Sequence, residues 1–267
     1  MKKYWSFFRL RFAMGLQYRA AALAGIITQF MWGFMELMIY TAFYRTDASA
    51  FPMTMQSTAS YIWLQQSFLF LFMTWRMENE IFDAIINGNV AYELCRPTDI
   101  YDMWFARSVA NRLSGVCLRC LPILLLAVFL PAPYGLSVPA GAGAAIGFIL
   151  SMILAILVTI SICMLVYIAT FFTMSPKGLQ VFCVTLIDFA SGSVIPLPFF
   201  PDGLRQVMEV LPFGSMQNVP FRVYSGDIAG GELVRAIGVQ FIWVVVLILL
   251  GKFLCRVALR RVQLQGG

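Results

Sequence analysis

The sequence predicts an all-α membrane protein with six transmembrane helices, an interfacial helix at the N-terminus and short re-entrant helices before the last span. Of the 267 residues, 60% are hydrophobic and 12% are charged, and the mean hydropathy of +0.80 does not describe a soluble chain. A helix that crosses the hydrocarbon core needs roughly 20 apolar residues, so this length holds about six spans with short loops. Lysine and arginine are also distributed unevenly between the polar segments.

Residues 1–19 predict a helix that lies on the membrane surface. Five basic side chains occur in this segment: Lys2, Lys3, Arg9, Arg11 and Arg19. Four apolar side chains repeat at the three-to-four spacing of one helix face: Trp5, Phe8, Phe12 and Leu16. A helix with an apolar face and many cations suits the boundary between headgroups and acyl chains.

Six apolar runs follow and form, with their connections, a single transmembrane domain over residues 1–267. We expect the spans at residues 20–43, 57–75, 113–130, 140–171, 179–195 and 236–253. Residues 76–112 contain the largest charged block of the chain, which cannot lie in lipid.

Residues 196–224 are interrupted by prolines and contain two apolar runs that are too short to span. Backbone in lipid must be helical or packed against protein, so we expect two short re-entrant helices. An external gate would then include Pro196, Pro198, Pro201 and Pro212.

The distribution of cations predicts the orientation. With both termini on one side, fourteen lysines and arginines lie on that side and four on the other, and Arg119 is left inside the third predicted span. Cytoplasmic loops carry the excess of these residues, so we expect both termini in the cytoplasm of a multi-pass protein of the plasma or inner membrane. The net charge of +6 then reflects orientation and contact with membrane lipid, and we expect no nucleic acid partner.

Several classes of chemistry are excluded. Histidine is absent, which removes Ser-His and Cys-His catalysis and the usual zinc sites. The Gly251-Lys252 pair is followed by Phe253 and lacks the preceding glycine of a P-loop. We therefore expect no enzyme, no cofactor and no metal site in this chain.

Two acids lie within predicted spans, Glu36 in the first and Asp188 in the fifth, and Gln29 lies two turns before Glu36. A charge inside the membrane is costly, so such residues usually face a cavity or a partner. They could line a substrate path, act in an ion- or proton-coupled secondary transporter, or be hydrogen-bonded acids between helices. A lipid-modifying enzyme is a further alternative, but it would need a nucleophile with an adjacent base.

The charged block contains a short amphipathic helix, predicted from Glu80 to Ile86, in which Ile81 and Ile85 lie one turn apart beside Phe82. Gly88 follows as a helix end. An amphipathic cytoplasmic helix can dock another protein or cover its own bundle.

The run Glu80 to Gly88, followed by Glu93-Leu-Cys-Arg-Pro97 and a renewed helix toward Asn111, resembles the segment after the second span of type-2 ABC-transporter permeases. The Leu94-Cys-Arg-Pro97 form is most similar to a bacterial branch with paired permeases. Ser191-Gly-Ser-Val-Ile-Pro196 through Leu211-Pro212 resembles the family's region between the fifth and sixth spans.

The resemblance implies a half-transporter, in most cases an exporter. Its partners would be a second permease, identical or paired, and two copies of a separate ABC ATPase that carries ATP and Mg²⁺. The helix near Glu80 would be a coupling helix that docks in an ATPase cleft, with Ile81, Phe82 and Ile85 inserted. The residues implied in coupling are Glu78, Glu80, Ile81, Phe82, Asp83, Ile85, Gly88, Arg96 and Pro97.

Overall fold

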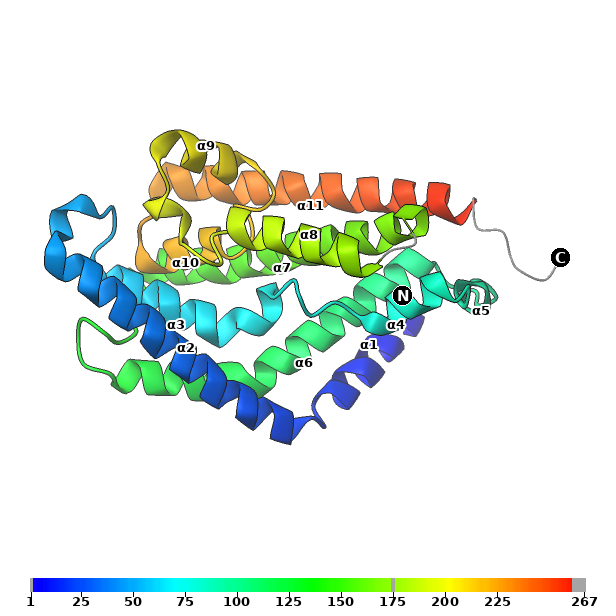
Figure 1. Ribbon diagram of the computed structural model, residues 1–267, viewed down its shortest axis with the longest axis horizontal. Coiled ribbons are helices and arrows are strands. Elements are labelled where there is room, and N and C mark those ends of the chain that lie inside the picture. Colours follow the sequence, from blue (N-terminus) through cyan, green and yellow to red (C-terminus); the bar gives the residue numbers. More distant parts are fainter. Residues whose placement is uncertain (1, 174–175, 261–267) are drawn as a thin grey trace.

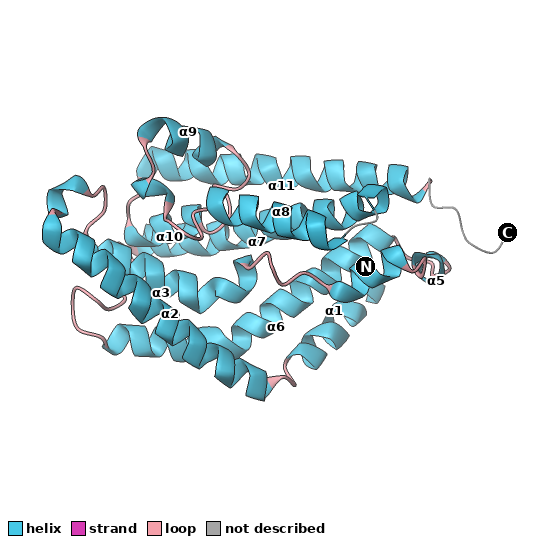
Figure 2. Cartoon of the chain, viewed as in Figure 1, coloured by secondary structure: helices cyan, strands magenta, loops and turns pink. Residues whose placement is uncertain are grey.

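The computed structural model describes residues 2–173 and 176–260, and over these residues the chain forms helices and loops without a β-strand (Figure 2). The α-helices are α1 (Lys2–Gly15), α2 (Arg19–Thr46), α3 (Met55–Phe72), α4 (Asn79–Ile86), α5 (Val90–Leu94), α6 (Ile100–Phe129), α7 (Ala142–Thr173), α8 (Pro176–Ala190), α9 (Asp202–Val210), α10 (Asn218–Ser225) and α11 (Gly230–Leu259). Two 3-10 helices are η1 (Ala48–Ala50) and η2 (Leu197–Phe199).

The long helices run lengthwise and give the molecule two distinct ends (Figure 1). At one end, here called the α4 end, lie α1, α4, α5 and the last turns of α7 and α11. At the opposite end, the α9 end, lie η1, η2, α9 and α10. The charged block and the proline-rich segment therefore occupy opposite ends of the bundle, as the alternation of predicted spans requires.

Among the described residues, four helices are long and apolar enough to cross a membrane: α2, α6, α7 and α11. They overlap four of the six expected spans. The central one is α7, whose spanning window is 67% buried, against 17% for α11. The outer helices therefore turn most of their apolar surface away from the protein, as lipid-facing helices do.

The other two expected spans, 57–75 and 179–195, coincide with α3 and α8, which fall short of that criterion. Helix α8 has only 15 residues. Helix α3 is nearly all buried between its neighbours and uses polar side chains for hydrogen bonds. Trp63 Nε1 donates to the Tyr134 carbonyl at 2.7 Å, and Gln65 Nε2 to the Ser193 carbonyl at 2.7 Å. A helix enclosed by protein does not need the hydropathy of one that faces lipid.

The charged block is more helical than its composition suggests. Helix α6 begins at Ile100, capped by Asp99, which accepts from the Asp102 amide at 3.1 Å. It continues to Phe129, so the predicted third span at 113–130 is only its second half. Helix α1, expected over 1–19, ends at Gly15 and packs along α6 without burying any residue of its own.

The proline-rich segment contains two short helices below spanning length. Helix α9 has nine residues and none is buried. Helix α10 has eight residues, and Val219, Phe221 and Val223 are buried where it packs against α7 and α3. The phenyl ring of Phe221 meets that of Tyr61 at 5.3 Å in a T-shaped pair. Helix α10 is thus part of the core, whereas α9 lies on its surface.

Candidate functional site

Helix α4 turns its apolar face toward the protein's own bundle. Ile81, Phe82 and Ile85 are 0%, 4% and 5% exposed. The phenyl ring of Phe82 packs against Tyr167 of α7 in a T-shaped pair with 5.0 Å between centroids. In this structure the three residues are therefore packed on the protein's own bundle, chiefly α7, and are not presented to an ATPase cleft as the resemblance implies. Each contributes about 1.5–3 kcal/mol to holding α4 on the bundle.

Glu78 fastens the start of α4 to two other helices. Its amide donates to the Tyr167 hydroxyl of α7 at 2.7 Å. Its carboxylate accepts from Asn111 Nδ2 of α6 at 2.6 Å and forms an ion pair with Arg107 at 3.6 Å. Arg107 also pairs with Glu80, which Arg11 of α1 approaches at 3.5 Å. These bonds join α4 to α1, α6 and α7.

The polar face of α4 points outward. Glu80, Asp83 and Asn87 are exposed and lie three and four positions apart on one side of the helix. Gly88 follows with φ of +71°, a left-handed conformation that ends the helix and favours glycine. On α4 and at its end, the candidate coupling residues at the surface are therefore the carboxylates of Glu80 and Asp83, with Gly88.

The other two candidate residues, Arg96 and Pro97, are exposed in the loop after α5. The Pro97 carbonyl accepts from Lys3 Nζ of α1. Within α5, the Glu93 carboxylate accepts from Trp104 Nε1 of α6 at 2.6 Å. The α5 loop is thus tied to both α1 and α6, and together with the outer face of α4 it forms the surface at the α4 end.

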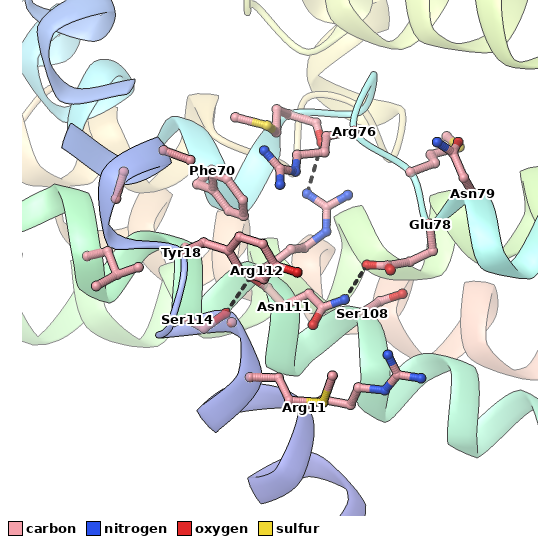
Figure 3. A pocket seen from close by; sticks show the side chains of 18 of the residues that line it. Arg11, Tyr18, Phe70, Arg76, Glu78, Asn79, Ser108, Asn111, Arg112 and Ser114 are labelled. Atoms are coloured by element: carbon pink, nitrogen blue, oxygen red, sulfur yellow. Dashed lines mark hydrogen bonds between the residues drawn. The ribbon is translucent and has the colours of Figure 1, made fainter. Parts of the chain in front are cut away.

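A cavity of about 520 Å³ lies behind α4, between α1, α6 and the segment that links α3 to α4 (Figure 3). We call it the arginine pocket because four arginines line it: Arg11, Arg76, Arg112 and Arg119. Arg112 is 7% exposed and donates to the carbonyls of Leu71 at 2.6 Å and Met73 at 3.0 Å. It therefore satisfies the backbone where α3 ends, a structural role.

Two of the pocket arginines meet at one aromatic ring. The guanidinium carbons of Arg76 and Arg119 lie 4.8 Å and 4.7 Å from the Phe70 ring centroid. Sequence reasoning left Arg119 unexplained inside a span and did not select Arg76. The sequence does contain a pattern that points to this pocket, because Ser108, Arg112 and Arg119 fall on one face of α6. The spacing of these residues does not reveal which other helices lie against that face.

The two acids of the candidate substrate path are held separately, each by a polar partner from α3 or its extension. Glu36 accepts from Gln66 Nε2 of α3 at 3.3 Å, and Asp188 accepts from Thr74 Oγ1 at 2.7 Å. Gln29 is 3% exposed, and neither its amide oxygen nor its amide nitrogen has a partner in the described residues. No bond among the described residues joins the two acids.

The candidate gate prolines lie at the α9 end. Pro196 and Pro198 are buried around η2, Pro201 caps the start of α9 and Pro212 follows its end. Near them, Phe199 of η2 meets Tyr40 of α2, with 5.2 Å between ring centroids. The prolines thus flank the short helices η2 and α9, of which η2 contacts α2.

Arg222 connects the short helices at the α9 end. Arg222 of α10 forms ion pairs with Glu209 of α9 and with Asp227 beyond α10. Burial disfavours its charge, but Asp227 and Glu209 outweigh that cost and hold the pKa of Arg222 above its usual value. These three residues fasten the surface helix α9 to the inserted helix α10, beside a cavity of about 610 Å³ that Arg222 and Glu209 line.

No curated protein gives a significant match to this chain. A family model described as ABC-2 family transporter protein matches residues 21–266, which include every helix from α3 to α11. An all-helical bundle with four long apolar helices agrees with a membrane subunit of that kind. The match covers nearly the whole sequence, and the chain belongs to the ABC-2 family of transporter proteins, whose members are membrane permease subunits.

Proposed function

We propose that this chain is the permease half of an ABC exporter, and that a separate ATPase docks on the surface at the α4 end. The observation that carries this proposal is the orientation of α4: its carboxylates face outward, while its apolar side is fixed to α7. A helix held in this way can pass a push at its outer face directly to α6 and α7. The family match supports the transporter class.

In this proposal two permeases, identical or paired, form the path, and two ATPase copies bind ATP and Mg²⁺ below them. The α4 end is cytoplasmic and the protein resides in the plasma or inner membrane, as the fourteen-to-four distribution of cations favours. Export is the direction that the resemblance implies. Helices α3 and α8 complete six spans: the polar groups of α3 are enclosed by the other helices, and Asp188 of α8 accepts a hydrogen bond from Thr74.

The contact with the ATPase is polar. Glu80, Asp83 and Gly88 provide it, with Arg96 and Pro97 beside them, and these charges orient the partner more than they add affinity. Gln29 and Glu36 lie along the substrate path on α2, and Asp188 lies on α8. The prolines between η2 and α9 belong to the external gate.

Charge reversal at Asp83 tests the docking surface. Asp83 is exposed on α4, so Asp83→Lys should leave the bundle folded and should weaken co-purification of the ATPase by roughly tenfold or more, as expected for reversed charge in an interface. The matched control is Glu232→Lys, an exposed acid in the first turn of α11 at the other end. The same ATPase recovery from both variants would contradict docking on the outer face of α4.

A further inference from the structure

The arginine pocket has more positive charge than the fold uses. Of its four arginines, Arg11 approaches Glu80 at 3.5 Å and Arg112 donates to two backbone carbonyls. The two glutamates that line the pocket, Glu78 and Glu80, are also paired with Arg107. The remaining cations of the pocket, Arg76 and Arg119, therefore have no carboxylate within it left to pair with.

Arg76 and Arg119 are brought together without a counter-charge. Neither forms an ion pair within residues 2–173 and 176–260, and both guanidinium groups lie on the ring of Phe70. Arg119 donates one bond to the Ala21 carbonyl at 3.3 Å, and its Nε is buried without a partner. Two cations that both lie within 5 Å of one ring centroid repel each other, and an anion bound near both would relieve that repulsion.

The pocket also offers a neutral donor, about three turns of α6 away from Arg119. Ser108 is 4% exposed, lines the cavity, and its hydroxyl has no partner among the described residues. A phosphate group accepts several hydrogen bonds at once and is the anion that paired guanidinium groups bind best. The volume of about 520 Å³ is ample for a phosphate with an attached glycerol.

The position of Arg119 indicates where this phosphate comes from. Its guanidinium lies against Gly25 of α2, where an added Cβ would come within 2.7 Å of the Arg119 Cζ atom. On either side of Gly25, Leu23 and Ile27 are 64% and 67% exposed, as expected for side chains that meet acyl chains. We propose that Arg76 and Arg119 bind the phosphate of an anionic membrane lipid whose acyl chains lie along α2.

This lipid site goes beyond the proposed transport function. It rests on that proposal only for the membrane leaflet from which the lipid comes, because the leaflet follows from the proposed orientation. It can be tested on the full-length chain in neutral detergent by native mass spectrometry with short-chain phosphatidylglycerol. The variant is R76Q/R119Q. The matched control is R45Q/R235Q, which removes two positive charges from exposed positions on α2 and α11 at the α9 end.

We expect R76Q/R119Q to bind phosphatidylglycerol about a hundredfold more weakly than the unchanged chain, roughly tenfold for each charged hydrogen-bonding group, and the control to stay within about twofold. Arg76 is exposed in the linker before α4, so R76Q alone folds independently of the contacts of Arg119 and should lose about tenfold. Equal lipid binding by R76Q, R76Q/R119Q and the control would overturn the site.

A second arm separates a lipid from a soluble phosphate. Glycerol phosphate and inorganic phosphate are added in place of phosphatidylglycerol at the same phosphate concentration, and we expect far weaker binding of both. If glycerol phosphate binds as tightly as the lipid and R76Q/R119Q abolishes it, the lipid assignment is overturned in favour of a soluble phosphate. ATPase co-purification is measured in parallel with the same variants. If R76Q/R119Q retains both the ATPase and the lipid affinity of the unchanged chain, the lipid site is refuted and the transport proposal remains intact.

Discussion

Truncation of Phe82 to alanine separates the two roles that α4 could have. The side chain is 4% exposed and its ring packs on Tyr167 of α7. Removing a buried phenylalanine side chain costs about 3–5 kcal/mol, which includes about 0.5–1.5 kcal/mol from the aromatic pair. The outer face of α4 is unchanged by this substitution. We therefore expect α4 to loosen from α7 while the surface that we propose for ATPase docking remains.

Local opening can be measured at Cys163, a buried thiol of α7 in the same apolar cluster as Phe82. The exposed Cys95 and Cys117 are first replaced by alanine so that they do not consume the reagent. If labelling of Cys163 requires α4 to detach, a loss of about 3 kcal/mol raises its rate on the order of a hundredfold. Phe82→Leu keeps most of the volume and should change the rate by roughly tenfold or less.

The functional readout of the same variant is the ratio of transport to ATP hydrolysis in proteoliposomes. We expect Phe82→Ala to keep the ATPase bound and to lower this ratio, because α4 no longer moves α7. An unchanged labelling rate of Cys163 would refute the packing argument. Loss of ATPase binding with an unchanged labelling rate would mean that Phe82 itself touches the ATPase, as its sequence pattern first suggested.

Gly115→Ala should destabilise the protein by about 1–3 kcal/mol in a thermal unfolding assay, because the new Cβ would lie 2.1 Å from the Phe70 ring. The control is Gly238→Ala, which has open space around it and should be neutral or slightly stabilising. Equal unfolding temperatures for the two variants would contradict the close approach of α3 and α6. In a chain without other cysteines, an impermeant maleimide added to intact cells should label Ser49→Cys and leave Cys95 unmodified until the membrane is permeabilised. The reverse pattern would invert the proposed orientation.

The sequence predicted best the elements whose formation depends on local pattern. The long apolar runs became α2, α6, α7 and α11, and the run Glu80 to Ile86 became α4 with one additional residue. The direction of the apolar face of α4 could not be predicted in this way. Ile81, Phe82 and Ile85 form the same stripe whether the partner is another chain or α7, so only the tertiary packing distinguishes the two.

Hydropathy is a weaker guide where burial replaces lipid contact. Gln65 and Gln66 lower the hydropathy of α3 below that of a typical span, yet both are buried and donate hydrogen bonds. In the same way, Arg119 is an unusual charge within a predicted span, but in the structure it contacts the Phe70 ring and the start of α2. Both cases depend on contacts between residues far apart in sequence, which a single sequence does not reveal.

The polar residues of α3 suggest why this helix is built differently from its neighbours. Near the α9 end, Gln65 holds the turn at Ser193, and one residue later Gln66 holds Glu36 of α2. At its other end, Arg112 of α6 binds the carbonyls of Leu71 and Met73, directly before the linker to α4. An apolar helix could slide past α2 and α6 at little cost. These directional hydrogen bonds instead keep α3 in register with its neighbours. A displacement of α4 that pulls on the linker must therefore break these bonds, or it must move α2 and the turn at Ser193 together with α3.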